Sequence, residues 1–82
     1  EVLILEPYWG SYVPMVIMAG ATPVTVLLHH ADQFSITEAV AAAITPRTKV
    51  LMVNSPNNPT GHVISQAEAE LVREMALKHD LY

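Results

Sequence analysis

The sequence predicts an α/β fold in which a parallel sheet lies between two layers of helices. Three apolar, β-rich runs recur along the 82 residues, and a helical pattern follows each one, so the expected order is β-α-β-α-β-α. The runs are continuously apolar rather than alternating, which is typical of strands covered on both faces. Strands that alternate with helices favour parallel pairing through right-handed crossovers. We therefore expect a three-layer parallel-sheet fragment.

The expected strands are rich in valine, leucine and isoleucine. They cover residues 1–7 (EVLILEP), 23–29 (PVTVLLH) and 49–55 (KVLMVNS). The expected helices cover residues 11–21, 35–44 and 65–80. The first helix has Pro14 in its first turn and Gly20 as its stop. Because this helix is apolar almost all round, we expect it to be buried on more than one side.

The second and third helices each begin with a capping pattern. Ser35 is followed three residues later by Glu38, and Ser65 is followed in the same way by Glu68. This spacing lets the serine hydroxyl and the glutamate side chain each bond a free backbone N–H of the first turn. We therefore interpret both serines as helix caps rather than as nucleophiles.

Size and composition indicate a piece of a larger folded protein. Hydrophobic residues make up 51% of the chain, which is typical of a globular protein. A free-standing domain of this length would bury only about 60–65% of its unfolded surface. The chain also starts at Glu1 inside an apolar run and stops at Leu81 and Tyr82, where another apolar run begins. We therefore expect the chain to be truncated at both ends.

Charge and motifs argue against several partners. The net charge is −4 and the four lysines and arginines form no cluster, so we expect no nucleic-acid binding. No apolar run approaches the roughly 20 residues of a membrane span, and no signal peptide is recognisable, so we expect no membrane partner and a cytoplasmic protein. The chain has no cysteine, which excludes disulfides, thiolate-bound metals and thiol nucleophiles.

The commonest phosphate and metal motifs are also missing. The three glycines cannot form either a G-x-G-x-x-G dinucleotide motif or a P-loop. His29 and His30 are neighbours, so in an extended chain their side chains point to opposite faces. His62 and His79 have no partner at a metal-binding spacing, and we expect no metal site.

Two loops are expected at the edge of the sheet where ligands bind. In open α/β sheets, ligands lie outside the carboxyl ends of the strands. Residues 6–12 (EPYWGSY) follow the first strand and carry the only tryptophan, Trp9. Residues 54–61 (NSPNNPTG) follow the third strand and are dense in turn-forming residues. We therefore expect Trp9 and the Asn-Pro loop, residues 54–61, to lie on the same edge.

These loops carry a family resemblance. NSPNNPTG resembles the Asn-Pro-Thr-Gly signature of fold-type-I aminotransferases that use pyridoxal 5'-phosphate (PLP). EPYWGSYVPMVIMAGA, residues 6–21, is similar to the segment that carries their cofactor-side aromatic residue. ITPRTKVLMVNSPNNPTG, residues 44–61, is similar to the aspartate aminotransferase-like subgroup of class I. The resemblance extends over essentially all 82 residues and implies that residues 1–82 are part of a PLP-binding large domain.

The resemblance implies site residues one by one. Asn58 matches the residue that hydrogen-bonds the phenolic oxygen of PLP and lies near the substrate carboxylate; a turn asparagine that bonds its own backbone is the alternative. Trp9 matches the position whose ring lies near the cofactor and whose indole N–H reaches a substrate carboxylate; a core tryptophan is the alternative. Pro59 matches a proline with a cis peptide bond before it, and Pro59, Thr60 and Gly61 shape the loop.

Other parts of the family's machinery match nothing in this chain. The Schiff-base lysine, the aspartate under the pyridine nitrogen and the arginine for the substrate carboxylate are all missing. Lys49 precedes an apolar strand and Lys78 is near a helix end, so neither suits the lysine's role. We therefore expect no catalytic residue in this segment and no activity from the chain alone. The resemblance also implies a sheet in which the strand beginning near Leu81 separates the third strand from the first two.

For the full-length protein, the resemblance implies an aminotransferase of amino-acid metabolism and biosynthesis. It would act on an amino acid and a 2-oxo acid and would form a homodimer. One alternative is another fold-type-I PLP enzyme, such as a lyase or a decarboxylase. The other alternative is a non-enzymatic α/β binding module.

Overall fold

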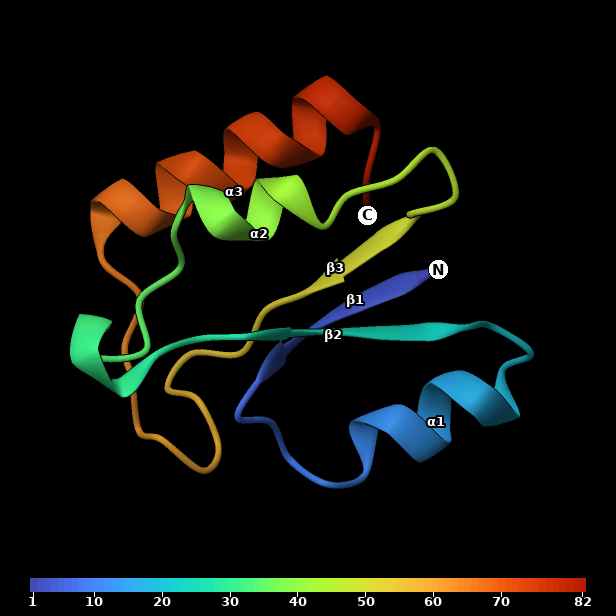
Figure 1. The fold of residues 1–82 in the computed structure, drawn as a ribbon, viewed down its shortest axis with the longest axis horizontal. Coiled ribbons are helices and arrows are strands. Elements are labelled where there is room, and N and C mark those ends of the chain that lie inside the picture. Colours follow the sequence, from blue (N-terminus) through green and yellow to red (C-terminus); the bar gives the residue numbers. More distant parts are fainter.

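The computed structural model describes residues 1–82 and confirms the predicted three-layer α/β fragment. Three parallel strands lie between helix α1 on one face and helices α2 and α3 on the other (Figure 1). A short 3₁₀ turn, η1, follows the second strand. In chain order the elements are β1 (Val2–Glu6), α1 (Tyr12–Met18), β2 (Pro23–Leu27), η1 (His30–Asp32), α2 (Glu38–Ala42), β3 (Val50–Met52) and α3 (Gln66–His79).

Strand β1 is the centre of the sheet, whose strand order is β2-β1-β3. Leu3 pairs with Val24 of β2 on one side and with Leu51 of β3 on the other. β3 is shorter than the expected strand, because its pairing with β1 ends at Met52 and the chain then turns into the Asn-Pro loop. This register places the carboxyl ends of β1 and β3 side by side.

The strand order corrects the expected one. We expected the strand beginning near Leu81 to separate β3 from the other two strands, but β1 and β3 are direct neighbours. The chain from Leu81 onward lies on the outer side of β3. There the Tyr82 N–H donates to the Lys49 carbonyl and the Tyr82 carbonyl accepts from the Leu51 N–H, both at 2.9 Å. This is the hydrogen-bond pattern of a parallel neighbour, so Tyr82 extends the sheet beyond β3.

The core lies between the sheet and helices α2 and α3. Leu3 and Ile4 are almost completely buried, and their side chains point to opposite faces because they are successive residues of a strand. The Leu3 face carries a cluster of six buried residues: Leu3, Leu28, Ile36, Val40, Leu51 and Met75. Each strand or helix on this face contributes at least one apolar side chain, so burial of this face stabilises the sheet and both helices together.

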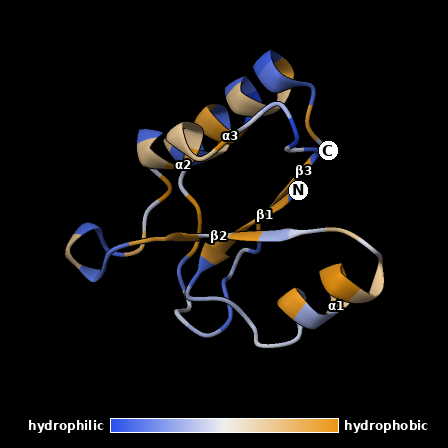
Figure 2. Cartoon of the chain, turned by 45° about the vertical axis from the view of Figure 1, so that its right-hand side comes forward, coloured by the Kyte–Doolittle hydropathy of each residue, from blue (hydrophilic) through white to orange (hydrophobic).

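Helix α1 covers the opposite face and leaves most of its own apolar surface open. Only Val16 is buried, while Met15, Ile17 and Met18 are exposed, and the helix is hydrophobic over most of its length (Figure 2). The expected burial of this helix on more than one side is therefore not met within the 82 residues. None of the helices is long and apolar enough to cross a membrane.

The helix ends confirm one predicted cap and correct the other. The capping box of Ser65 and Glu68 is present in full at the start of α3. Ser35, however, is not a cap, because α2 starts later and its cap is Thr37, whose hydroxyl accepts from the Ala39 N–H. Ile36, between Ser35 and Thr37, is buried in the core, and its N–H donates to Glu68 rather than to a cap at Ser35.

Candidate functional site

The candidate site lies where the loops after β1 and β3 meet. The Asn57 Nδ2 atom donates to the Pro7 carbonyl at 3.0 Å, across 50 positions of sequence. This bond joins the Asn-Pro loop directly to the segment that carries Trp9. The structure therefore brings together the two loops that the sequence predicted at one edge of the sheet.

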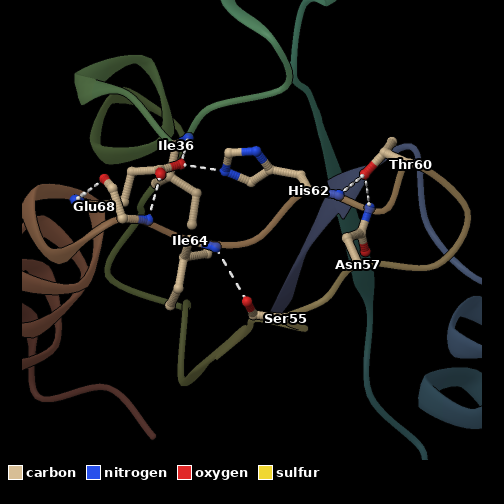
Figure 3. Close-up of polar contacts among 8 residues, drawn as sticks. Ile36, Ser55, Asn57, Thr60, His62, Ile64 and Glu68 are labelled. Atoms are coloured by element: carbon tan, nitrogen blue, oxygen red, sulfur yellow. Dashed lines mark hydrogen bonds and ion pairs between the residues drawn. The ribbon is translucent and has the colours of Figure 1, made fainter.

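Hydrogen bonds within the Asn-Pro loop hold it in one shape (Figure 3). The Asn57 N–H donates to the His62 carbonyl and the Gly61 N–H donates to the Asn57 carbonyl, both at 2.8 Å. The Thr60 hydroxyl accepts from Asn57 Nδ2 at 2.9 Å and from the His62 N–H at 3.2 Å. Gly61 has a φ of +74°, a conformation that glycine adopts without steric cost. Asn58 and Pro59 form the tip of this closed turn.

The peptide bond between Asn58 and Pro59 is cis, as expected. The bonds that precede Pro7 and Pro56 are cis as well.

The two neighbouring asparagines have different roles. Asn57 uses its side chain for the turn and for the contact with Pro7. Asn58 is exposed, and its side chain makes no hydrogen bond within the chain. The role of a turn asparagine therefore belongs to Asn57, which leaves the amide of Asn58 free to bind a ligand.

Trp9 is not a core residue. The residue is 48% exposed, and its ring meets Tyr12 edge-on with the ring centroids 5.7 Å apart. The edge-to-face contact orients the indole while leaving much of its surface accessible. Trp9 follows Pro7 by two positions, and Asn58 directly follows Asn57, so the Asn57–Pro7 bond keeps both candidate residues on one edge.

An apolar pocket lies next to these loops. Nine of its twelve lining residues are hydrophobic. Its polar lining comes from Asn54, Asn57 and His62, with Tyr12 beside them. Neither Trp9 nor Asn58 lines this pocket, so it is separate from the candidate ligand contacts.

Sequence reasoning missed a polar contact behind the Asn-Pro loop. His62 Nε2 lies 2.8 Å from Glu68 Oε1, a contact that the spacing of the histidines, which we considered only for metal binding, does not predict. The same carboxylate accepts from the Ile36 N–H at 2.7 Å and from the Ser65 N–H at 2.8 Å. Only the capping box pointed to Glu68, and that pattern does not predict the contacts with His62 and Ile36.

The surroundings of Glu68 favour its charged form. Burial of the side chain acts to raise the pKa of Glu68, but the hydrogen bonds from Ser65, Ile36 and His62 outweigh it and lower the pKa to about 2. Because an ionised carboxylate only accepts hydrogen bonds, His62 Nε2 carries the hydrogen in this contact.

The residues at this edge fit one part of a PLP molecule. An accessible indole and an unbonded amide suit a flat aromatic ring that carries an oxygen anion. No lysine or arginine follows the carboxyl end of a strand: Arg47 and Lys49 lie at the opposite edge, and Arg73 and Lys78 are on α3. A cationic partner for the phosphate of such a ligand would therefore come from outside residues 1–82.

The family model for aminotransferase class I and II matches residues 1–82, the whole chain. The chain belongs to the class I and II aminotransferase family. Within this family, the aspartate aminotransferase of Musicola paradisiaca is 45% identical over the whole chain. The aromatic-amino-acid aminotransferase 2 of Thermococcus litoralis is 40% identical over 99% of it. The chain spans about a fifth of the length of these curated relatives.

Solved aminotransferase structures share the fold. The aspartate aminotransferase from Thermus thermophilus with maleate superposes on 99% of the chain with a TM-score of 0.95 and 48% identity, and the chain covers 22% of it. So close a match means that the neighbouring β1 and β3 reflect the family's own arrangement. The strand order that we expected from the resemblance was therefore wrong.

Proposed function

We propose that residues 1–82 are part of the large, PLP-binding domain of an aminotransferase that moves an amino group between an amino acid and a 2-oxo acid. The observation that carries this proposal is the joined pair of loops, in which the Asn57–Pro7 bond places Trp9 and Asn58 on one edge of the sheet. Family membership supports the reaction class. The chain covers only about a fifth of its relatives' length, which supports the proposal that it is part of a domain.

Asn58 is proposed to hold the phenolic oxygen of PLP. An amide N–H next to that oxygen stabilises its anionic form, and the charge strengthens the hydrogen bond. The exposure of Asn58 and the absence of a competing hydrogen bond support this role. The turn made by Asn57, Thr60 and Gly61 holds the Asn58 backbone, so the backbone loses little freedom on binding.

Trp9 is proposed to lie against the cofactor ring, with its indole N–H near the substrate carboxylate. Contact between two flat rings gives both dispersion energy and a defined orientation. The edge-on contact with Tyr12 supports this role, because it holds the indole without covering it.

PLP, when bound, supplies the electron sink for the chemistry at the amino acid's α-carbon. The residues of this chain position and orient, and the proton-transferring lysine is proposed to lie outside residues 1–82. Lys49 lies at the amino end of β3 and Lys78 in the last turn of α3, so neither is near the candidate site. The chain alone is therefore proposed to be inactive.

This segment is proposed to supply chemistry common to the family rather than substrate choice. A relative named for aspartate and a relative named for aromatic amino acids match the same residues at 45% and 40% identity. Residues that distinguish such side chains are accordingly expected elsewhere in the full-length protein.

The test is an assay of the full-length protein that contains residues 1–82. Purified protein is titrated with PLP by absorbance and then incubated with amino acids and 2-oxo acids in pairs. We expect stoichiometric PLP binding and one new amino acid formed for each one consumed. Amino-acid consumption with release of ammonia or carbon dioxide, and with no new amino acid, would instead support the lyase or decarboxylase alternative. Absence of PLP binding would contradict the proposal.

Sedimentation of the same sample tests the homodimer that we also propose for the full-length protein.

A further inference from the structure

Glu68 is a buried carboxylate whose partners come from three separate segments. It is 7% exposed, and no lysine or arginine contacts it. Its donors are the Ser65 N–H at the start of α3, the Ile36 N–H before α2 and His62 Nε2 after the Asn-Pro loop (Figure 3). A helix cap needs only the first of these contacts. The other two join parts of the chain that are far apart in sequence.

We propose that Glu68 and His62 are positioning residues for the cofactor contact of Asn58, with Glu68 acting through the imidazole of His62. This inference rests on the proposed function, because it assigns a second layer of residues to the same site. Neither residue is proposed to touch the cofactor or the substrate.

The path from Glu68 to Asn58 is short and consists of hydrogen bonds. Glu68 holds the His62 imidazole at 2.8 Å. The backbone of His62 closes the turn, since its carbonyl accepts from the Asn57 N–H and its N–H donates to the Thr60 hydroxyl. Asn58 directly follows Asn57 in that closed turn. Movement of His62 would therefore displace the residue next to Asn58.

The other contacts of the loop do not replace this one. Asn57 fixes the loop to Pro7 at the β1 side, and Ser55 Oγ accepts from the Ile64 N–H at 3.0 Å on the β3 side. The His62–Glu68 pair is the side-chain contact that joins the loop to α3. Without it, the loop keeps its two contacts near the sheet and is joined to α3 through residues 62–65, of which Ile64 packs against the core.

The test uses the full-length protein with four sequences: wild type, His62→Ala, His62→Gln and Ser65→Ala. His62→Ala removes the contact with Glu68. His62→Gln replaces the imidazole N–H with an amide N–H of similar reach. Ser65→Ala is the matched control, because it removes the cap hydroxyl but leaves the Ser65 N–H to donate to Glu68.

Three readouts separate positioning from general stability. The first is the dissociation constant of PLP, which we expect to rise about tenfold in His62→Ala and to stay within about threefold of wild type in the other two variants. The second is hydrogen exchange at the Asn57 and Gly61 amides, which we expect to become about tenfold faster in His62→Ala only. The third is the pH midpoint of the bound cofactor's visible absorbance, which we expect to move upward in His62→Ala because the phenolic anion loses a fixed donor.

Different results overturn different statements. Wild-type protein that binds no PLP would overturn the proposed function itself. Wild-type binding with unchanged affinity and unchanged exchange in His62→Ala would overturn only the positioning role. A loss in Ser65→Ala as large as that in His62→Ala would also overturn it, since the effect would then come from helix stability.

Discussion

Acid should weaken this fold through Glu68, and replacing Glu68 with glutamine should remove that effect. The pKa of Glu68 is lowered from 4.5 to about 2 in the folded protein, against burial, by hydrogen bonds from Ser65, Ile36 and His62. A group whose pKa falls on folding stabilises the folded state at any pH above its unfolded pKa. The stabilisation is lost as the pH falls from about 5 towards 2.

The size of this effect follows from the change in pKa. The difference between 4.5 and about 2 corresponds to about 3 kcal/mol at neutral pH, as an order of magnitude, at about 1.4 kcal/mol for each pH unit. Glu68→Gln should destabilise the fold by a similar amount. Its amide has one oxygen instead of two, so in either orientation the NH₂ group would face one of the N–H donors, that of Ile36 or that of Ser65.

Urea unfolding of the 82-residue chain followed by circular dichroism measures both quantities. At pH 7 we expect a gap of about 2–3 kcal/mol between wild type and Glu68→Gln, with similar m-values. The gap should shrink steadily below about pH 5 as the wild type loses its advantage. A gap below about 0.5 kcal/mol at pH 7, or a gap that does not change with pH, would refute the reasoning about Glu68.

Three further predictions concern the loops, the caps and the missing lysine. Asn57→Ala should destabilise the fold by about 1–2 kcal/mol in urea unfolding, because it loses the hydrogen bonds to Pro7 and Thr60. Asn58→Ala should change the stability by less than about 0.5 kcal/mol but weaken PLP binding to the full-length protein. Equal losses of stability in the two variants would contradict the separate roles of the two asparagines. Thermal unfolding should show a loss of about 1 kcal/mol for Thr37→Ala and almost none for Ser35→Ala, and the reverse order would restore Ser35 as the cap. Borohydride reduction of the isolated chain with equimolar PLP, read by mass spectrometry, should give no stoichiometric adduct at a single lysine. One dominant modified lysine would contradict the proposal that the Schiff-base lysine lies in another part of the protein.

Local patterns in the sequence were enough to predict the layers of the fold and the edge that carries the site. Continuous apolar runs that alternate with helical patterns predict parallel strands covered on both faces. This holds for β1, where Leu3 and Ile4 are buried on opposite faces, but not for β2, whose Leu27 is exposed. The Ser65 capping box depends only on residues of one turn, so its spacing was sufficient. The position of the two loops followed from the same rule, since the carboxyl ends of parallel strands share an edge.

The features that sequence reasoning missed depend on contacts between distant residues. Strand order is set by which edges pair, and nothing in the local pattern of residues 49–55 distinguishes a neighbour of β1 from a strand farther out. Ser35 had the spacing of a cap, but the Ile36 side chain is buried in the core and its N–H donates to Glu68, and Thr37 caps the helix instead. The partner of His62 is Glu68, whose capping pattern already explained its presence without a second role.

The most direct test of the proposed site is a crystal structure of the full-length protein with PLP bound. We predict that Asn58 Nδ2 lies within hydrogen-bond distance of the phenolic oxygen and that the Trp9 ring lies against the cofactor ring, with the Asn57–Pro7 bond intact. Density that places PLP away from the carboxyl ends of β1 and β3, or that turns Asn58 or Trp9 into the protein interior, would contradict the account.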